Sequence, residues 1–540
     1  MSQITSWLNR LDDRINPIVL KELRQAVNGR FVAAVLGLFL LISLIVITVA
    51  LMQIDPNNAS EELGLETLLW LQGILVATCL LFLPVYTAIR MGAERSDTNT
   101  DLLFISTLRP RQIIGGKLAA SVILGLLIYS ACMPFMTLTY LLRGVDLPSI
   151  FLVLGMGFCV VVMAVALALF AACVSTSRGF RVMMGLSLLG TLGVAIFASV
   201  GASVGIMASG FASTIGGGEF WGIIGTWLLS VGCSVAMLFS FSVALVSPPA
   251  SNRALGVRLT VLAVYLVNSA MICIWAMTTG DDELMGFFGA VGMMFGSGML
   301  LVAICERDRW TDRLLRTVPR SSLWRYGAML FYSGSLGGLM FGWLIVGLTW
   351  AGLWVADMQW MHLSAEQHVR MIQWVVGVPL FVTAYLLTAR LLRDHLLGRW
   401  VKYEHTWALA IVIAGCCAGV PVVLELMTAG PGGWGTDQYG SVLSPVALTY
   451  GASTRINAII TAGAWTVIAL ALNGPWLYRQ LCEFRRPPEA AKPPKPPKPP
   501  ESPKPPESTA SLRPLCSEAT PEIAAASARP IVRPTNRSSP

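Results

Sequence analysis

Three short patterns in the sequence come near known chemical motifs: one is only a fragment of its motif, and the other two lack the context that their chemistry requires. Gly115-Gly116-Lys117-Leu118 has neither the upstream glycine nor the hydroxyl residue of a phosphate-binding loop. The run 430–435, Gly-Pro-Gly-Gly-Trp-Gly, matches the dinucleotide fingerprint, but no strand precedes it. Gly201-Ala202-Ser203-Val204-Gly205 has nucleophile-elbow spacing without a strand or a nearby histidine, so its small residues favour close helix packing instead.

The spacing of the His, Asp, Glu and Cys residues does not indicate a metal site or a disulfide framework. His362 and His368 are six residues apart, near Asp357 and Glu366, but polar residues scattered at a membrane interface give the same pattern. The 11 cysteines contain no Cys-x-x-Cys pair, so neither a zinc site nor a disulfide framework is indicated. We therefore expect no metal, no cofactor and no catalytic site in this chain.

The composition is that of a membrane protein. Hydrophobic residues make up 55% of the 540 residues and charged residues 13%, against about 25% charged in a soluble globular protein. Uncharged runs recur that approach the roughly 20 residues an α-helix needs to cross a bilayer. They predict an all-α polytopic protein with about twelve spans, at 31–54, 67–89, 118–142, 150–176, 182–206, 221–247, 259–279, 285–305, 326–355, 371–390, 407–427 and 456–478.

The basic residues predict which loops are cytoplasmic, because Lys and Arg are retained on that side. With a cytoplasmic N-terminus, the outside segments hold three basic residues, Arg143, Arg370 and Arg455, against 27 inside when the eight of the distal tail are left out. Twelve spans return the C-terminus to the cytoplasm. We expect a multi-pass protein of the cytoplasmic (inner) membrane with both termini inside.

The segments that flank the spans differ in character. Residues 1–30 show helical apolar spacing, with Asn16 as an N-cap and Pro17 at the first helical position, which is typical of amphipathic helices at the membrane interface. Residues 484–540 are rich in Pro, Lys, Glu and Ala and are expected to form a disordered cytoplasmic tail. The membrane region divides into two domains of six spans, 31–247 and 259–480.

The interiors of the predicted spans lack Asp, Glu, Lys and Arg, and Arg390 and Glu425 stand at span ends. Carriers that run on ion gradients usually place such residues inside their helices, because a gradient needs a site that loads and unloads. Energy for transport is therefore expected to enter from outside the membrane segment. A membrane-embedded enzyme is disfavoured because no histidine or carboxylate constellation lies within the spans.

The loop between the second and third spans carries a recognisable pattern. It begins with Glu94-Arg95, continues through a Leu-Leu-x-x-Ser-Thr stretch over 102–107, and ends in Arg109-Pro110-Arg111 and a Gly-Lys pair at Lys117. This loop resembles that of ABC-2 type transporter permeases. The segment 16–25, Asn-Pro-Ile-Val-Leu-Lys-Glu-Leu-Arg-Gln, is similar to their N-terminal amphipathic segment. The resemblance extends over about the first 247 residues.

The resemblance implies a six-helix domain with an amphipathic connecting helix and a short cytoplasmic coupling helix that receives motion from a separate ATP-binding subunit. We therefore expect a permease subunit of an ATP-driven exporter, with ATP bound by the partner and none bound here. The loop residues expected to contact the partner or the interface are Glu94, Arg95, Leu102, Leu103, Ile105, Arg109, Pro110, Arg111 and Lys117. The alternative is an ordinary positive-inside loop. Six further spans depart from the simplest family members.

A loop in the second half has a similar layout. Leu314-Leu315 begins eight residues after Glu306, as Leu102 follows Glu94, and Pro319-Arg320 parallels Pro110-Arg111. The second half is either a divergent copy of the first, or the agreement arises by chance in an arginine-rich loop. The second candidate coupling residues are Glu306, Arg307, Leu314, Leu315, Pro319 and Arg320. A gradient-driven carrier is the rival function, and the composition favours no particular substrate.

Overall fold

A computed structural model gives the fold and describes residues 16–53, 62–94, 109–142, 145–174, 178–208, 217–248, 251–280, 283–359, 365–398, 401, 403–429, 442–449 and 452–485. Within these ranges the regular structure is helical and no strand occurs. Eleven helices are long and apolar enough to cross a membrane. The described residues thus have the make-up of an all-α, multi-pass membrane protein.

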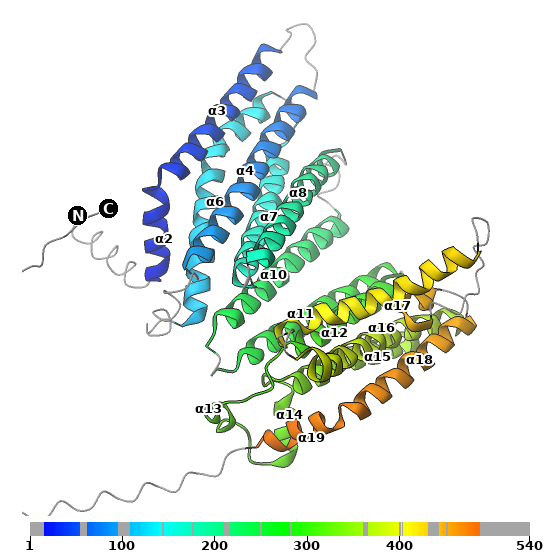
Figure 1. Cartoon of the computed structure of the whole chain (residues 1–540). Helices are drawn as coiled ribbons and strands as arrows, with labels where there is room; N and C mark the ends of the chain where they lie inside the picture. Colours follow the sequence, from blue (N-terminus) through cyan, green and yellow to red (C-terminus); the bar gives the residue numbers. More distant parts are fainter. Residues whose placement is uncertain are drawn as a thin grey trace, which may run out of the picture. The chain divides into compact units, whose positions relative to one another are not determined.

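The first group of helices begins with the short α2 (Pro17–Val27). Six long helices follow: α3 (Arg30–Met52), α4 (Glu62–Glu94), α6 (Pro110–Leu141), α7 (Leu147–Val174), α8 (Arg178–Ala208) and α10 (Gly218–Val246). Figure 1 shows them side by side, coloured from blue to green. The core is centred on α4 and α7, where Leu71, Leu75 and Ala168 are fully buried.

The second group contains six further long helices. They are α11 (Arg253–Thr279), α12 (Glu283–Ile304), α15 (Ser335–Gln359), α16 (Ala365–Leu392), α17 (Thr406–Ala429) and α18 (Ala452–Leu472). Short helical pieces join or follow them: α13 (Asp312–Leu315), α14 (Ser322–Met329), η1 (Arg393–Leu397), η2 (Tyr403–His405), η4 (Pro445–Thr449) and α19 (Gly474–Glu483). Leu300, Phe341 and Leu386 lie fully buried between α12, α15 and α16.

The two groups pair their long helices in the same order. In the first group the second helix, α4, packs against the first, third, fourth and fifth, and the fourth, α7, packs against the third, fifth and sixth. In the second group α12 and α16 take these same positions and make the same pairings. In the first group α4 and α7 are the most buried helices, whereas in the second group α16 is the most buried and α12 and α15 are buried to the same extent.

Two predicted spans end differently from the apolar runs. The run 326–355 is divided between α14 and α15, because the chain turns at Leu330–Gly334 and its carbonyl groups there accept hydrogen bonds from Arg258. Gly334 has a φ of 146° at this turn, which favours glycine. The run 456–478 is divided at Asn473, where α18 gives way to α19. In α17 (Thr406–Ala429) the described apolar stretch is Thr406–Pro421.

The flanking segments are only partly described. α2 confirms the predicted amphipathic helix with Asn16 as its cap, whereas residues 1–15 lie outside the described residues. The predicted tail boundary at 484 is wrong, because Phe484 is 1% exposed and packs against Trp310 and Tyr332. Residues 486–540 lie outside the described residues.

Candidate functional site

The candidate site lies where α2 packs against α6. Asn16 accepts a hydrogen bond from the backbone N–H of Ile18 at 3.1 Å, and its Nδ2 donates to the carbonyl of Gln112 at 2.6 Å. A Cβ atom placed on Gly116 would lie 2.9 Å from Cβ and Cγ2 of Ile18, so only glycine lets the two helices approach this closely. The segment 16–25 is therefore packed against residues 112–116 of α6.

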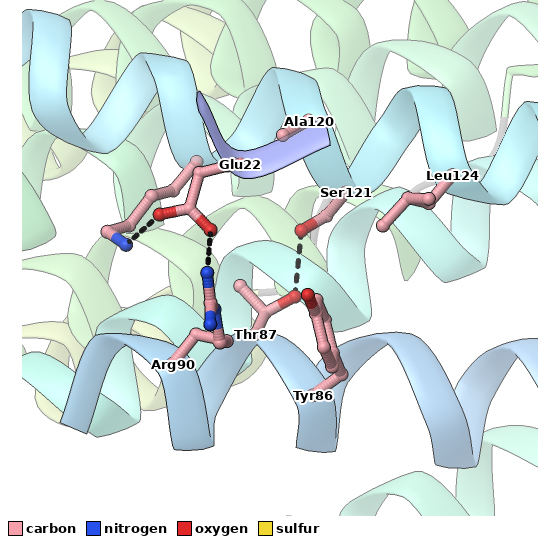
Figure 2. Close-up of a pocket in the computed structure, with 8 residues that line it drawn as sticks. Glu22, Tyr86, Thr87, Arg90, Ala120, Ser121 and Leu124 are labelled. Carbon is pink, nitrogen blue, oxygen red and sulfur yellow. Dashed lines mark hydrogen bonds and ion pairs between the residues drawn. The ribbon is translucent and has the colours of Figure 1, made fainter. Parts of the chain in front are cut away.

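Glu22 of α2 lies at the centre of an ion-pair cluster, named here the Glu22 cluster. Its Oε1 accepts a hydrogen bond from Lys117 Nζ at 2.7 Å, and its Oε2 lies 3.4 Å from Arg90 Nη2, as Figure 2 shows for Glu22 and Arg90. Lys117 Nζ is also 2.8 Å from Glu94 Oε2, and Lys21 Nζ is 3.7 Å from Glu94 Oε1. The cluster thus ties α2 to the end of α4 and to α6.

Burial makes this pairing necessary. Glu22 is 6% exposed and Lys117 is 3% exposed, and an unpaired charge at such a position is strongly unfavourable. Burial, the largest influence, raises the pKa of Glu22, but the hydrogen bond from Lys117 and the positive charges of Lys117, Arg90 and Lys21 outweigh it. The pKa of Glu22 is lowered from its ordinary value of 4.5, so this carboxyl is ionised at neutral pH.

A small cavity adjoins the cluster. Thr87 Oγ1 and Ser121 Oγ are hydrogen bonded across it at 2.8 Å (Figure 2), and the hydroxyl of Thr87 also donates to the carbonyl of Leu83 at 2.6 Å. The lining residues are Glu22, Tyr86, Thr87, Arg90, Lys117, Ala120, Ser121 and Leu124. A cavity of about 10 Å³ has room for roughly one water molecule. The site is therefore suited to joining helices rather than to holding a solute.

The structure places the predicted loop residues as follows. Glu94 is the last residue of α4, and Pro110 is the first of α6. The backbone N–H of Arg109 donates to Gln112 Oε1 at 3.0 Å, and the side chains of Arg109 and Arg111 are exposed. Lys117, expected to face a partner, is instead buried in the Glu22 cluster. Arg95, Leu102, Leu103 and Ile105 lie outside the described residues.

The second candidate loop is fixed by internal contacts. Both carboxylate oxygens of Glu306 accept hydrogen bonds from Arg258 Nη2, at 2.8 and 2.7 Å, and Oε2 also accepts one from the N–H of Gly334 at 2.6 Å. Arg258 is fully buried. A Cβ atom on Gly338 would lie 2.9 Å from Arg258 Nη2, so this glycine leaves room for the guanidinium group. Glu306 thus neutralises a buried charge.

Asp308 has a similar role in the same loop. Its Oδ2 lies 2.9 Å from Arg390 Nη2 and accepts a hydrogen bond from Trp476 Nε1 at 3.0 Å. Its Oδ1 accepts hydrogen bonds from the N–H and the hydroxyl of Ser335. The guanidinium carbon of Arg390 lies 3.8 Å from the centre of the Trp476 ring. This loop therefore holds α15, α16 and α19 together.

The apolar residues of the second loop are also engaged. Leu314 is 8% exposed, and Leu315 packs against a cluster of Val318, Met329 and Phe484. Arg307 and Arg320 are exposed, and Pro319 is half-buried. Leu314 and Leu315, which were predicted to contact a partner, thus pack within the chain's own core.

The other sequence motifs gain no support as sites. Gly201–Gly205 lies inside the helix α8, where a strand-to-helix turn is absent. The run 430–435 and His362 lie outside the described residues, and the side chain of His368 is not described. Among the described residues, no group of three or more His, Cys, Asp or Glu residues is arranged to hold a metal ion.

The burial of Lys117 and Arg258 was not predicted, because the apolar runs at 118 and 259 begin directly after these two residues. The helices begin earlier, at Pro110 and Arg253, so Lys117 and Arg258 lie within α6 and α11. The apolar neighbours Val257 and Leu259 were the signal for Arg258. Comparison with protein-family models, curated proteins and solved structures finds no match to this chain.

Proposed function

We propose that this chain is the membrane-spanning permease subunit of an ATP-driven transporter of the ABC-2 type, working as an exporter. A separate subunit binds and hydrolyses ATP and acts on the loop 95–108. The observation that carries the proposal is the Glu22 cluster. It joins Glu94, directly before this loop, and Lys117, in the helix α6 that follows it, to the amphipathic helix α2.

The cluster supplies a path for mechanical work. A displacement of the loop moves the end of α4 and the start of α6, and the ion pairs to Glu22 carry α2 with them. The packing of Ile18 against Gly116 adds a steric contact to the electrostatic one. Because Arg109 and Arg111 stay exposed at the same end, the partner has cationic side chains to recognise.

The common order of helix pairing supports a 6+6 internal repeat. In this proposal one polypeptide supplies the two membrane halves that other exporters build from two chains. The two loops between second and third helices have diverged, since Glu306 and Leu314 of the second loop serve the chain's own packing. The loop 95–108 is therefore proposed as the main point of coupling.

The rival function is a carrier driven by an ion gradient. The described helices hold more buried charge than the apolar runs suggested: Arg455 is buried at the start of α18, and Lys117, Arg258 and Arg390 are buried within α6, α11 and α16. Lys117, Arg258 and Arg390 each have a carboxylate oxygen within 2.9 Å, so none of these three is left to load and unload an ion alone. This pairing favours energy input at a protein surface over input by a gradient.

The test is co-purification. The tagged full-length chain is extracted from native membranes in a mild detergent, and Mg²⁺-dependent ATP hydrolysis and bound proteins with a phosphate-binding loop are measured. Replacing Leu102, Leu103 and Ile105 with serine is expected to remove the ATPase at unchanged yield. Replacing the exposed Leu323 and Trp324 of the second loop is the control and is expected to retain it.

Two outcomes would contradict the proposal. One is a wild-type chain that transports in vesicles with a proton gradient and no ATP-binding protein. The other is a triple variant that keeps its ATPase in full.

The proposed orientation has its own test. Both termini and the Glu22 cluster are placed on the cytoplasmic side because of the 27 to 3 partition of basic residues. Cysteines introduced at positions 60, 282 and 436 are expected to react with an impermeant reagent from outside, with the wild-type chain as background. Labelling only after permeabilisation at any of these positions would revise the spans there.

A further inference from the structure

Most buried basic residues of this chain have a carboxylate partner, and Arg455 differs. Arg258, Arg390 and Lys117 are each at most 4% exposed and each has a carboxylate oxygen within 2.9 Å. Arg455 is 6% exposed, and its Nε has no hydrogen-bond partner. Among the residues that the structure describes, no hydrogen bond or ion pair reaches its guanidinium group.

Arg455 stands in the first turn of α18, on the face that packs inward. Ala458 and Ala462, three and seven residues further, are fully buried in one cluster with Phe381 of α16 and Leu448 of η4. Residues at this spacing share one face of a helix. The buried position of Arg455 therefore follows from the packing of α18 and is not an accident of its own side-chain conformation.

The surroundings of Arg455 suit an anion. Side chains on a helix lean toward its N-terminus, so the guanidinium group is directed to the end of α18. The first backbone N–H groups of a helix lack intrahelical acceptors and carry a partial positive charge. Ser453 and Thr454 add two hydroxyl groups at this end. These are the donors that bind oxyanions at helix N-termini.

We propose that the N-terminal end of α18 binds a phosphate group, with Arg455 as its counter-charge. A buried cation without a partner is strongly unfavourable, so a ligand that supplies the missing charge is stabilised here. Phosphate is favoured over a carboxylate because guanidinium, amide and hydroxyl donors together exceed what two oxygens accept. The site is at the end of a helix long enough to span a bilayer, so the phosphate comes from a phospholipid headgroup or from free phosphate.

This site is independent of the proposed ATP-driven function. It concerns the end of the second helix group where the count of basic residues predicts the outside, and it involves no residue of the Glu22 cluster. Arg370 provides a matched control, because it is also predicted to face outside but is exposed and paired with Glu366 at 2.8 Å.

The experiment uses the full-length chain, purified and delipidated in a neutral detergent. One arm measures binding of radiolabelled inorganic phosphate, and the other measures binding of short-chain phosphatidylglycerol, with diacylglycerol of equal chain length as the probe that lacks phosphate. We expect one or both phosphate probes to bind, with affinity at least tenfold weaker in Arg455→Gln and unchanged in Arg370→Gln. Arg455→Lys, which keeps the charge, is expected to retain some of the binding.

A melting comparison covers the case in which Arg455→Gln folds poorly. Without phosphate, Arg455→Met is expected to melt at or above the wild-type temperature, because it removes an unpaired buried charge. With a saturating phosphate probe, only the wild type is expected to gain stability. The proposal is overturned if neither probe binds the wild type, or if Arg455→Gln binds equally. It is also overturned if Arg455→Met lowers the melting temperature without ligand, since the partner of Arg455 is then in the chain.

Discussion

The two loops that join the second and third long helices of each group use charge in different ways. In the first group, Lys117 of α6 pairs with both Glu22 and Glu94, and the side chains of Arg90 and Glu94 stay about one-third exposed. In the second group, Glu306 and Asp308 lie within the loop and are enclosed by hydrogen-bond donors. The first arrangement leaves a loop anchored at its ends, and the second closes the loop onto the bundle.

The difference separates two uses of a loop between helices. A loop that transmits motion needs firm ends and a surface that a partner reaches. A loop that supports a fold needs its polar groups satisfied inside the chain. The first loop has firm ends near Glu94 and Lys117, and the second has its polar groups satisfied at Arg258 and Arg390.

The largest expected effect is at the buried pair of the second loop. Glu306→Gln removes the charge that neutralises Arg258, which is fully buried, so we expect a loss of about 3–5 kcal/mol in unfolding free energy. The measurement is thermal unfolding in detergent together with the amount of membrane-inserted protein. A double variant, Arg258→Met with Glu306→Leu, is expected to recover much of the loss. Full stability of Glu306→Gln alone would contradict the closed-loop interpretation.

In the first group the matching change is Glu22→Gln. Lys117 keeps Glu94 as a partner at 2.8 Å, so the expected loss is smaller, about 1.5–3 kcal/mol. The readout is the same unfolding assay, with exposure of α2 to limited proteolysis as a local measure. An effect larger than that of Glu306→Gln would reverse the comparison between the two loops.

The contact between α2 and α6 is tested by a glycine pair. Gly116→Ala places a methyl group 2.9 Å from Ile18 and is expected to cost about 1–3 kcal/mol. Gly115→Ala is the matched control, because its methyl group meets only Phe239 at an ordinary 3.8 Å. Unfolding of the two variants is compared side by side. Equal stability of both would show that α2 does not need this close approach.

A smaller effect is expected from pH. The pKa of Glu22 is lowered in the folded chain, so its contribution to stability is full above the ordinary pKa of 4.5 and is lost as pH falls through the lowered value. The stability difference between wild type and Glu22→Gln should therefore stay constant from pH 7 to about pH 5 and shrink below it. A difference that grows on acidification would mean that Glu22 is protonated at neutral pH.

The smallest effect is expected at the C-terminal end. Removal of residues 487–540 should leave membrane insertion and melting temperature unchanged, because the segment is too polar and proline-rich to form a core. A chain that ends at Glu483 also loses Phe484, which is buried against Trp310 and Tyr332. That shorter chain is expected to melt at a clearly lower temperature. Equal behaviour of the two truncations would remove Phe484 from the folded unit.

Uncharged runs predicted most of the fold because spanning helices must be long and apolar. They failed where a side chain distant in sequence determines where a helix is interrupted. At residues 330–334 the backbone carbonyl groups accept hydrogen bonds from Arg258 of another helix. They also failed at Phe484, since an apolar residue next to a proline-rich stretch has no periodicity to mark it as buried.

The individual residues of the candidate site were predictable, but their assembly was not. The sequence singled out the segment 16–25, Glu94 and Lys117, but it gave no sign that they touch. The contact between these residues depends on the packing of α2 against α6. In the sequence, the small residue Gly116 is the local sign of that packing. Burial of Lys117 could not be read from a list of cytoplasmic charges, because helices extend beyond their apolar runs.

In the proposed function, energy enters through the loop 95–108 and passes to α2 by way of the Glu22 cluster. The most direct measurement is hydrogen–deuterium exchange on the chain purified with the proposed ATP-binding partner, with and without Mg²⁺-ATP and vanadate. We predict that trapping changes amide protection in 16–28 and 109–117, and that the change in 16–28 is lost in Glu22→Gln while that in 109–117 persists. Unchanged protection of both segments on trapping, with the partner's ATPase fully inhibited, would contradict the account.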